Sequence, residues 1–245
     1  MGEFVHPRTV HTAACRPRGR ADFPSERRSW LFFVPIAFRN VVLVVPAKLL
    51  QVPNVTFIRH GQSASNAGLV THDFSQIELT PEGLRQANEL ADSWKETPSL
   101  IITSSFLRAI QTAQPTINRF SNVPVDQWPV QEFTNLEPAI WNGTRPSDRI
   151  EAVDEYWRRQ DPGFLDGPST ESFSSFLRRV EAVMIRLANL PHDRVLVFTH
   201  GYFMHAARLH ASFRDRTDRE RMAQFRDAWQ SQPIANCDLF QLTLG

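Results

Sequence analysis

Short apolar runs recur along the chain after residue 52, and most of them stop at a polar residue or a glycine. Residues 55–59, 100–103 and 194–199 are rich in β-branched and aromatic side chains, which is typical of buried strands. Residues 124–130 predict a further strand, and residues 238–244 alternate apolar and polar positions as an edge strand does. We expect these segments to form one sheet.

Helix start signals lie between the strands. Thr80 is suited to an N-cap and Pro81 to the first helical position, so a helix is predicted to begin there. Ser104 and Ser105 predict the cap of a second helix. Pro115 should end or bend that helix, because proline lacks the N–H that a helix interior needs.

Apolar residues at helical spacing mark the second half of the chain. Residues 171–190 form an amphipathic pattern whose apolar stripe should face the core. Residues 147–159 and 202–230 are also predicted to be helical, whereas the rest of residues 131–170 is irregular and suited to a lid or a binding wall. Helices that alternate with strands predict an α/β fold, a three-layer α/β/α sandwich with a mostly parallel central sheet.

The segment before residue 53 differs from the rest. Residues 1–29 are rich in Arg and Pro without an apolar period, which favours disorder or a translated extension. Residues 30–50 are long and apolar enough to span a bilayer, but Arg39 interrupts the run, and a charge at mid-bilayer is costly. We interpret residues 1–52 as an N-terminal extension, disordered or a weak anchor, and residues 53–245 as the domain. We expect a cytoplasmic protein, with membrane association through residues 30–50 as the alternative.

Composition narrows the function classes. The chain has 245 residues, of which 42% are hydrophobic, enough for a core. The net charge of +1 gives no indication of nucleic-acid binding. Cys15 and Cys237 lie far apart without a CxxC partner, which argues against a disulfide framework and a structural zinc site.

Two of the predicted strands end in the same way. Arg59, His60 and Gly61 follow the first, and His200 and Gly201 follow the fourth. In a parallel sheet both imidazoles project from the carboxyl edge, where ligands bind. Arg next to His is a poor pairing for stability but a good one for an anion, above all a phosphate. Gly61 also lets backbone come close to whatever lies there.

Further polar groups are predicted near this edge. Ser63 and Asn66 add neutral donors shortly after His60, and Arg108 lies one turn into the helix that follows the second strand. The residues together predict a phosphate-binding site.

A series of motifs runs along the chain in this order: Arg59-His60-Gly61 with Asn66; Leu79-Thr80-x-x-Gly83 with Gln86-Ala87; Ser104-x-x-x-Arg108-Ala109-x-Gln111-Thr112-Ala113; Glu171-Ser172-Phe173; and Thr199-His200-Gly201. Together they resemble the histidine phosphatases, also called the phosphoglycerate mutase-like superfamily. The resemblance covers residues 53–245 and implies the phosphoglycerate mutase-like fold.

The resemblance implies a role for the charged residues. His60 would be the nucleophile and become a phosphohistidine, which requires a neutral imidazole whose other nitrogen is held by a hydrogen bond. Arg59, Arg108 and His200 would surround the phosphoryl oxygens, because phosphoryl transfer is catalysed mainly by holding charge. No metal or other cofactor is implied, since these groups take the place of a metal.

Neutral residues would complete the substrate site that the resemblance implies. Asn66 and Ser63 would hydrogen-bond the phosphoryl group, and Gly61 and Gly201 would bring backbone close to it.

The superfamily also uses a carboxylate that protonates the leaving oxygen and then activates water. Glu132 and Glu137 are the two candidates in this sequence. We favour Glu132, because it follows a predicted strand, whereas Glu137 is followed at once by Pro138. The choice between them stays open on the sequence alone.

Other polar and aromatic residues have alternative interpretations. His72, His192, His205 and His210 are expected at the surface or in helices. Arginines in the irregular region could contact an anionic tail of the substrate or could be ordinary surface residues: Arg145, Arg149 and Arg158. Aromatic residues there could form pocket walls or belong to the core: Trp141, Tyr156 and Trp157.

The sequence therefore predicts a metal-independent phosphomonoester hydrolase acting through a phosphohistidine on His60. The alternatives are a phosphoglycerate mutase-type phosphotransferase and a non-catalytic protein that binds a phosphorylated ligand. The expected partner is a small phosphorylated metabolite or a phosphoprotein and not a nucleic acid, with membrane contact through residues 30–50 as the less favoured alternative.

Overall fold

The computed structural model describes residues 52–244. The predictions for the apolar run at 30–50 and for the segment before it lie outside the described residues. Within residues 52–244, no helix combines the length and apolar character needed to cross a membrane.

The strands of the described chain form a single sheet in the order β3-β2-β4-β1-β5. All neighbouring pairs are parallel except β5, which runs antiparallel to β1 at one edge. The mostly parallel sheet and the edge position of the last strand confirm the prediction. The strands are β1 (Asn54–Arg59), β2 (Leu100–Thr103), β3 (Val125–Gln127), β4 (Arg194–Thr199) and β5 (Leu239–Thr243).

Strand β3 is shorter than the predicted 124–130. Pro129 has no N–H to donate to a neighbouring strand, so the ladder cannot continue through it. The backbone of Trp128 makes a last bond to the Thr103 carbonyl, 3.0 Å away, and the chain then leaves the sheet toward Val130.

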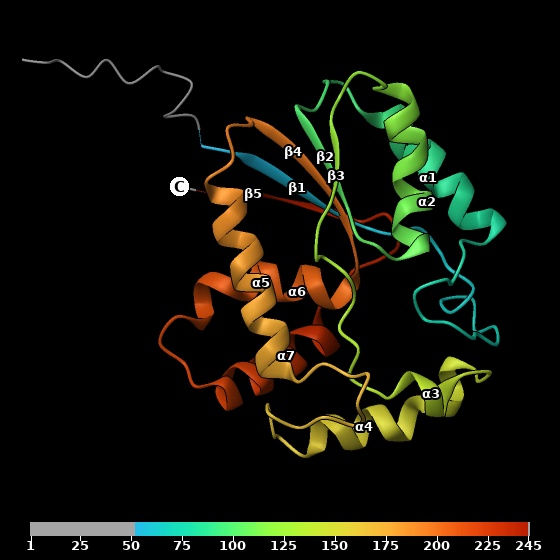
Figure 1. Cartoon of the computed structure of the whole chain (residues 1–245), viewed down its shortest axis with the longest axis vertical. Coiled ribbons are helices and arrows are strands. Elements are labelled where there is room, and N and C mark those ends of the chain that lie inside the picture. The colour runs from blue at the N-terminus through green and yellow to red at the C-terminus, as the bar shows by residue number, and fades with distance from the viewer. Residues whose placement is uncertain (1–51, 245) are drawn as a thin grey trace, which may run out of the picture. The chain divides into compact units, whose positions relative to one another are not determined.

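The central strands are buried on both faces, and their side chains alternate between two cores. Val55 and Phe57 of β1 join the larger core, whereas Ile58 joins a smaller one on the opposite face. Figure 1 shows α1 and α2 on one side of the sheet and α5 and α6 on the other. This arrangement is the three-layer α/β/α sandwich that the sequence predicts.

Helices α1 (Pro81–Ser93) and α2 (Leu107–Arg119) form the first layer. Thr80 caps α1 as predicted, its side chain accepting from Gly83 N. The predicted serine cap of α2 is wrong: its N-cap is Phe106, without a side-chain bond. Pro115 lies inside α2, which continues to Arg119, so the predicted helix end is also wrong. The apolar residues Ala113 and Ile117 on either side of it pack into the smaller core and hold the last turn in place.

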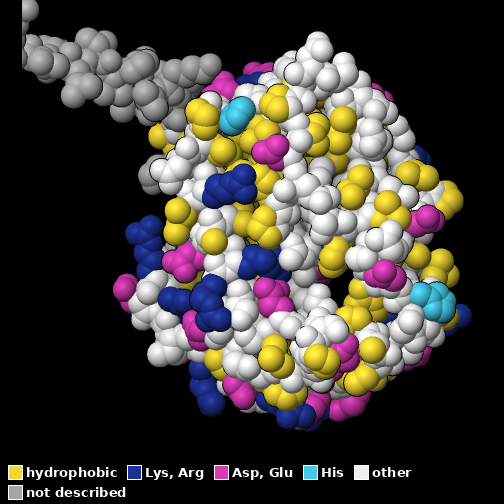
Figure 2. All heavy atoms as spheres, in the orientation of Figure 1, with side chains coloured by type: hydrophobic (Ala, Val, Ile, Leu, Met, Phe, Trp, Pro, Cys, Tyr) yellow, Lys and Arg dark blue, Asp and Glu magenta, His cyan; other side chains and the backbone are white. Residues whose placement is uncertain are grey.

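Helices α5 (Phe173–Ala188), α6 (Gly201–Leu209) and α7 (Asp218–Ser231) form the other layer. The predicted stripe of α5 is buried. The predicted helix over 202–230 is divided, because a short 3-10 helix (His210–Phe213) follows α6 and a capping box of Thr217 and Glu220 starts α7. Acidic and basic side chains lie interspersed on the face drawn in Figure 2, in keeping with the net charge of +1.

The irregular region between β3 and α5 lies beyond the carboxyl ends of the parallel strands (Figure 1). It contains α3 (Pro138–Trp141), a 3-10 helix (Pro146–Arg149) and α4 (Ile150–Arg158). An isolated bridge joins Thr144 of this region to Thr71 of the loop after β1. The two segments therefore form adjoining walls above the sheet edge.

Candidate active site

The two predicted histidines converge. Arg59 and Thr199 are register partners on the neighbouring strands β1 and β4, so His60 and His200 leave the sheet side by side. Their ring centroids are 5.1 Å apart. Both residues are almost fully buried, with exposed fractions of 3% and 0%.

The hydrogen bonds of His60 define its tautomer. Its Nδ1 lies 2.8 Å from the Gly61 carbonyl oxygen and donates to it, while Nε2 accepts from Arg108 Nε at 3.1 Å. Burial lowers the pKa of His60 well below its ordinary value, and the nearby charges of Arg108 and Arg59 lower it further. The ring is therefore neutral at pH 7, with a lone pair on Nε2.

Two guanidinium groups lie near this lone pair. Arg108 donates from Nη1 to the Phe74 carbonyl oxygen at 2.8 Å, and Arg59 donates to the Ile234 carbonyl oxygen. Burial lowers the pKa of both side chains, that of Arg108 to about 10. Within the described part of the chain neither forms an ion pair with a carboxylate, so their positive charge is available to an anion.

His200 is held by Ser104. Its Nε2 lies 2.8 Å from Ser104 Oγ, which also accepts from the Phe106 backbone N–H. When Ser104 donates its hydroxyl proton to Nε2, the ring proton lies on Nδ1. That nitrogen has no hydrogen-bond partner among residues 52–244. Burial and Arg108 lower the pKa of His200 well below its ordinary value, so it offers a neutral donor.

Ser63 and Asn66 form a small hydrogen-bonded turn beside His60. Asn66 Oδ1 accepts from the backbone N–H and the hydroxyl of Ser63, at 3.2 and 3.1 Å. Asn236 Nδ2 donates to the same Oδ1 and to the His60 carbonyl oxygen, both at 3.0 Å. The acceptor side of the Asn66 amide is therefore occupied, which turns its Nδ2 donor toward a ligand. Asn236 was missed on the sequence, because it lies in a short linker with no periodic pattern.

Gly61 and Gly201 serve close packing. A Cβ on Gly61 would lie 2.7 Å from the Gly83 carbonyl oxygen, so the loop that follows His60 packs directly on the first turn of α1. A Cβ on Gly201 would lie 3.0 Å from the Trp229 ring. The Gly61 backbone N–H is already bonded to Thr112 Oγ1 at 2.9 Å.

Glu132 faces the same cavity as His60 and Arg108. Its Oε1 accepts from the backbone N–H groups of Tyr202 and Phe133, at 3.0 and 3.2 Å. Burial raises the pKa of its carboxyl, and Arg108 and Arg59 partly oppose that effect. The Tyr202 N–H lies in the first turn of α6, where backbone N–H groups have no partner within the helix. The sequence pattern does not show which group such an N–H will bind.

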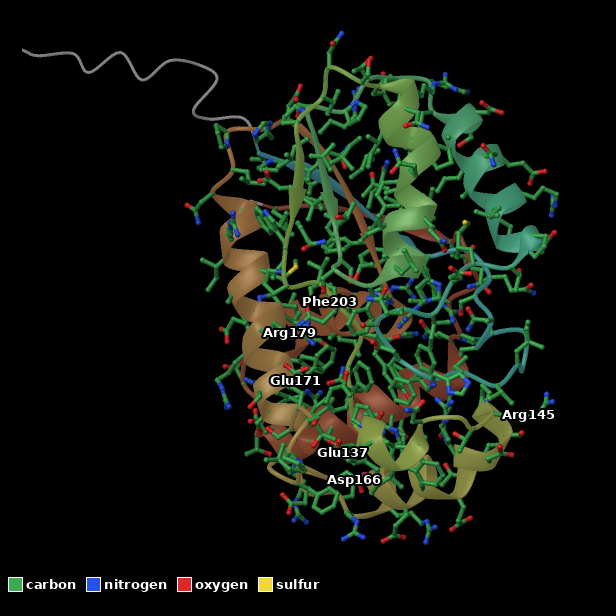
Figure 3. All side chains as sticks on the ribbon, turned by 45° about the vertical axis from the view of Figure 1, so that its right-hand side comes forward. Glu137, Arg145, Asp166, Glu171, Arg179 and Phe203 are labelled. Atoms are coloured by element: carbon green, nitrogen blue, oxygen red, sulfur yellow. The ribbon has the colours of Figure 1, made fainter. Side chains whose placement is uncertain are left out.

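Glu137 has a different environment. Its two carboxylate oxygens accept from Ser169 N at 2.9 Å and from Ala139 N at 3.3 Å, so it caps α3. These hydrogen bonds lower the pKa of its carboxyl. It does not line the cavity, and Figure 3 shows it next to Asp166 at the outer end of the region. Geometry therefore favours Glu132 as the carboxylate beside His60.

The cavity has a volume of about 260 Å³. Its lining combines the charged residues above with several apolar side chains and one further arginine, Arg149. Arg145 and Arg158 do not line it, and Tyr156 and Trp157 are buried in the core. The principal apolar wall residues are Phe74, Ile77, Phe106, Leu136 and Val153.

His205 lies in a helix as predicted but is only 1% exposed. Among the described residues, no cluster of three His, Cys, Asp or Glu side chains is placed to hold a metal.

A neutral buried imidazole whose Nε2 accepts from Arg108, two guanidinium groups without a carboxylate partner and a carboxyl at one sheet edge are suited to a phosphoryl group. A sequence model described as Histidine phosphatase superfamily (branch 1) matches residues 55–231, well over half of the chain. The chain belongs to the histidine phosphatase superfamily. The predicted class, a phosphatase of this superfamily, is confirmed.

Named relatives and solved structures agree with this assignment. The chain is 29% identical over 152 residues to a probable phosphoglycerate mutase of Yersinia enterocolitica, a match that covers 60% of this chain and 69% of the relative. A mycobacterial glucosyl-3-phosphoglycerate phosphatase has a similar structure, with a TM-score of 0.56 at 22% identity over 78% of this chain and 90% of the other.

A second solved structure is that of a phosphoserine phosphatase variant from Entamoeba histolytica in complex with phosphoserine. It gives a TM-score of 0.58 at 20% identity, covering 77% of this chain and 89% of the other. At these identities the likeness establishes the fold.

Proposed function

We propose that residues 53–245 form a metal-independent phosphomonoester hydrolase that works through a phosphohistidine on His60. The observation that carries the proposal is the state of His60. Its imidazole is neutral and buried, Nδ1 is held by the Gly61 carbonyl, and Nε2 presents a lone pair between Arg108 and the cavity. A nucleophilic imidazole needs this combination.

The first step transfers the phosphoryl group to the protein. His60 Nε2 forms a bond to phosphorus while the bond from phosphorus to the ester oxygen breaks, and the leaving oxygen takes a proton from Glu132. The incoming phosphoryl oxygens replace Nε2 as the partner of Arg108 Nε. Arg59, His200 Nδ1 and the Asn66 amide hold the remaining oxygens, so most of the catalysis is electrostatic.

The second step releases phosphate. Glu132, now a carboxylate, takes a proton from water, whose oxygen attacks phosphorus. The phosphorus–nitrogen bond breaks and its electron pair returns to His60 Nε2. The raised pKa of Glu132 suits both parts, because a group that titrates nearer the working pH exchanges protons more effectively in each direction.

The substrate class follows from the size of the cavity. About 260 Å³ accommodates a small phosphorylated metabolite, and solved relatives by name act on molecules of that kind, phosphoserine and glucosyl-3-phosphoglycerate. Small phosphorylated metabolites are therefore the substrates we propose.

Phosphoglycerate mutase activity is the second candidate, supported by the 29% identical relative with that name. A mutase returns the phosphoryl group from His60 to a second substrate hydroxyl and must exclude water meanwhile. The two reactions share the first step and differ in the acceptor.

A labelling experiment tests the proposal. The full chain is incubated with an aryl phosphate in the presence of EDTA, and the protein is examined for acid-labile phosphate on His60 by mass spectrometry. We expect steady release of phosphate with EDTA present and transient label on His60, both lost in His60→Ala and retained in the surface control His72→Ala. Turnover without label would refute the phosphohistidine route, and binding without turnover would indicate a non-catalytic phospho-ligand protein. Activity that depends on a bisphosphate primer would indicate the mutase.

A further inference from the structure

Arg149 is fixed at the cavity wall by neutral groups. Its Nε donates to Thr144 Oγ1 at 2.9 Å, and its Nη2 donates to Thr71 Oγ1 and the Thr144 carbonyl oxygen at 2.7 and 2.8 Å. The guanidinium carbon lies 4.7 Å from the centroid of the Phe74 ring. The side chain is thus held in one position before any ligand arrives, which lowers the entropic cost of binding.

Arg149 has no ion-pair partner in the described chain. Among residues 52–244 no carboxylate lies within ion-pair distance of it, and its Nη1 has no hydrogen-bond partner. The neighbouring Asp148 carboxylate acts on it only from a longer distance, and burial still lowers the pKa of Arg149. A half-buried cation that has no ion-pair partner is suited to an anionic ligand.

Phe74 separates Arg149 from the catalytic cations. The Phe74 carbonyl accepts from Arg108, and its ring lies under Arg149, so the two guanidinium groups flank one residue. Both line the same cavity.

Asn135 lies on the same wall and is an independent sign of a polar ligand. It lines the cavity, its side chain is 8% exposed, and its amide Nδ2 is buried without a hydrogen-bond partner in the described chain. A buried amide donor left unpaired costs free energy unless a ligand supplies an acceptor. The cavity lining also includes the apolar side chains of Phe74, Ile77 and Phe106.

We propose that Arg149 is the anion-binding element of a second subsite, so that the preferred substrate is a phosphomonoester whose leaving group carries a carboxylate or second phosphate on a short apolar or aromatic body. This inference rests on the proposed function for the hydrolysed phosphoryl group. It adds the group at the other end of the molecule, held by Arg149 Nη1 while the phosphoryl group lies against Arg59 and Arg108.

The competing interpretation is that Arg149 only ties the Thr71 loop to the Thr144 segment. In that case its loss would loosen the cavity wall and slow all substrates alike. A matched pair of probes separates the two, namely phenyl phosphates that carry either a carboxylate or the neutral carboxamide at the same ring position, with meta and para isomers of each.

We expect the wild-type chain to prefer the carboxylate probe in kcat/KM, and Arg149→Gln to reduce that preference about tenfold to a hundredfold, the range of a charge-assisted hydrogen bond. Arg149→Lys should retain part of the preference. Arg145→Gln is the matched control: Arg145 lies at the outer edge of the same region (Figure 3), bonds the Gly68 carbonyl and does not line the cavity. It should leave the preference intact.

Other outcomes overturn the inference. No preference in the wild-type chain, or equal loss of both probes in Arg149→Gln, leaves Arg149 a structural tie. If neither probe is hydrolysed, the proposed function fails, but the subsite is still tested by calorimetry with the corresponding phenylphosphonates. Tighter binding of the carboxylate phosphonate that is lost in Arg149→Gln would support the subsite, and equal binding of the two would refute it.

Discussion

At the scale of single residues, the structure gives Glu132 and Glu137 different environments, whereas the sequence left them as two alternatives for one role. Glu132 and Glu137 are five positions apart in one irregular segment. Only the structure shows that Ser169 and Ala139 donate to the Glu137 carboxylate, while Tyr202 donates to Glu132 at the cavity. His60, Arg108 and His200 were candidates on the sequence because strand ends and a helix start have local signals. The Tyr202 donor to Glu132 comes from a distant segment and has none.

The role proposed for Glu132 makes a prediction that depends on the leaving group. Glu132→Gln keeps the shape of the side chain but cannot donate or take up the proton. For alkyl phosphates, whose leaving oxygen needs that proton, we expect turnover to fall by about two to four orders of magnitude. With 4-nitrophenyl phosphate the first step should persist, and phosphohistidine should accumulate because water is no longer activated.

Glu137→Gln is the matched control for this substitution. Wild-type turnover of alkyl phosphates in Glu132→Gln, together with a large loss in Glu137→Gln, would transfer the role to Glu137.

The same two residues set the pH dependence of the reaction. The lowered pKa of His60 keeps the nucleophile neutral, so kcat/KM should decline only as pH falls through a pKa well below the ordinary value of 6.5. The raised pKa of Glu132 keeps the acid protonated to higher pH than a free glutamate, and kcat/KM should decline as pH rises through it. The resulting bell should lose its alkaline limb in Glu132→Gln, and a pH profile of kcat/KM checks this.

At the scale of elements, helix α5 supports the segment that carries Glu132, the proposed acid. Arg179 forms a 2.6 Å ion pair with Glu171 and donates to the carbonyl oxygens of Pro129 and Gln131, each at 3.0 Å. Figure 3 shows Arg179, Glu171 and Phe203 close together where α5 meets α6. Arg179 thus holds the backbone that leads directly into Glu132.

We expect Arg179→Met to displace Glu132 and lower kcat about tenfold to a hundredfold with little change in KM, because small misplacements of a reacting group are costly. Stability should fall by about 1 to 3 kcal/mol, since Glu171 and two carbonyls lose their partner. The control is Arg178→Met, an exposed neighbour that bonds only Ser175. A larger effect on alkyl than on nitrophenyl phosphate would identify positioning, whereas equal loss for both would indicate a purely structural role.

The sequence predicted most securely the elements with strong apolar patterns. Strands β1, β2 and β4 carry apolar residues on both faces, and α5 has a continuous apolar stripe. One of the errors arose where a polar residue has two possible partners. Ser104 has a side chain suited to cap α2, but its hydroxyl is bonded to His200, and that contact between distant segments leaves no local signal.

At the scale of the whole molecule, buried neutral histidines make stability sensitive to acid. Burial lowers the pKa of His205 to about 4, and that of His60 and His200 well below the ordinary value. The unfolded chain takes up these protons near pH 6.5 while the folded protein does not, so stability falls as pH decreases from about 6.5 toward 4. Carboxylates with lowered pKa values, such as Glu137, act mainly below this window.

His205→Leu tests this dependence without touching the cavity. Between pH 6.5 and 5 the wild-type free energy of unfolding should fall, and the variant should lose about 1 to 2 kcal/mol less of it, which denaturant titrations at the two pH values measure. The surface substitution His72→Leu provides the comparison. An unchanged slope in His205→Leu would show that its ring is not the proton acceptor of the unfolded chain in this range.

The contact between Gly61 and Gly83 has a consequence for transplanting this chemistry. The two backbones meet there with no room for a methyl group. The Gly61 N–H of the same loop also donates to Thr112 of α2. If only the short peptide around His60 were grafted onto a foreign sheet, it would lack its contacts with Gly83 and Thr112. A transplant would need α1 and α2 for these contacts and β4 as well, since that strand joins β1 to β2 in the sheet and carries His200 at its end.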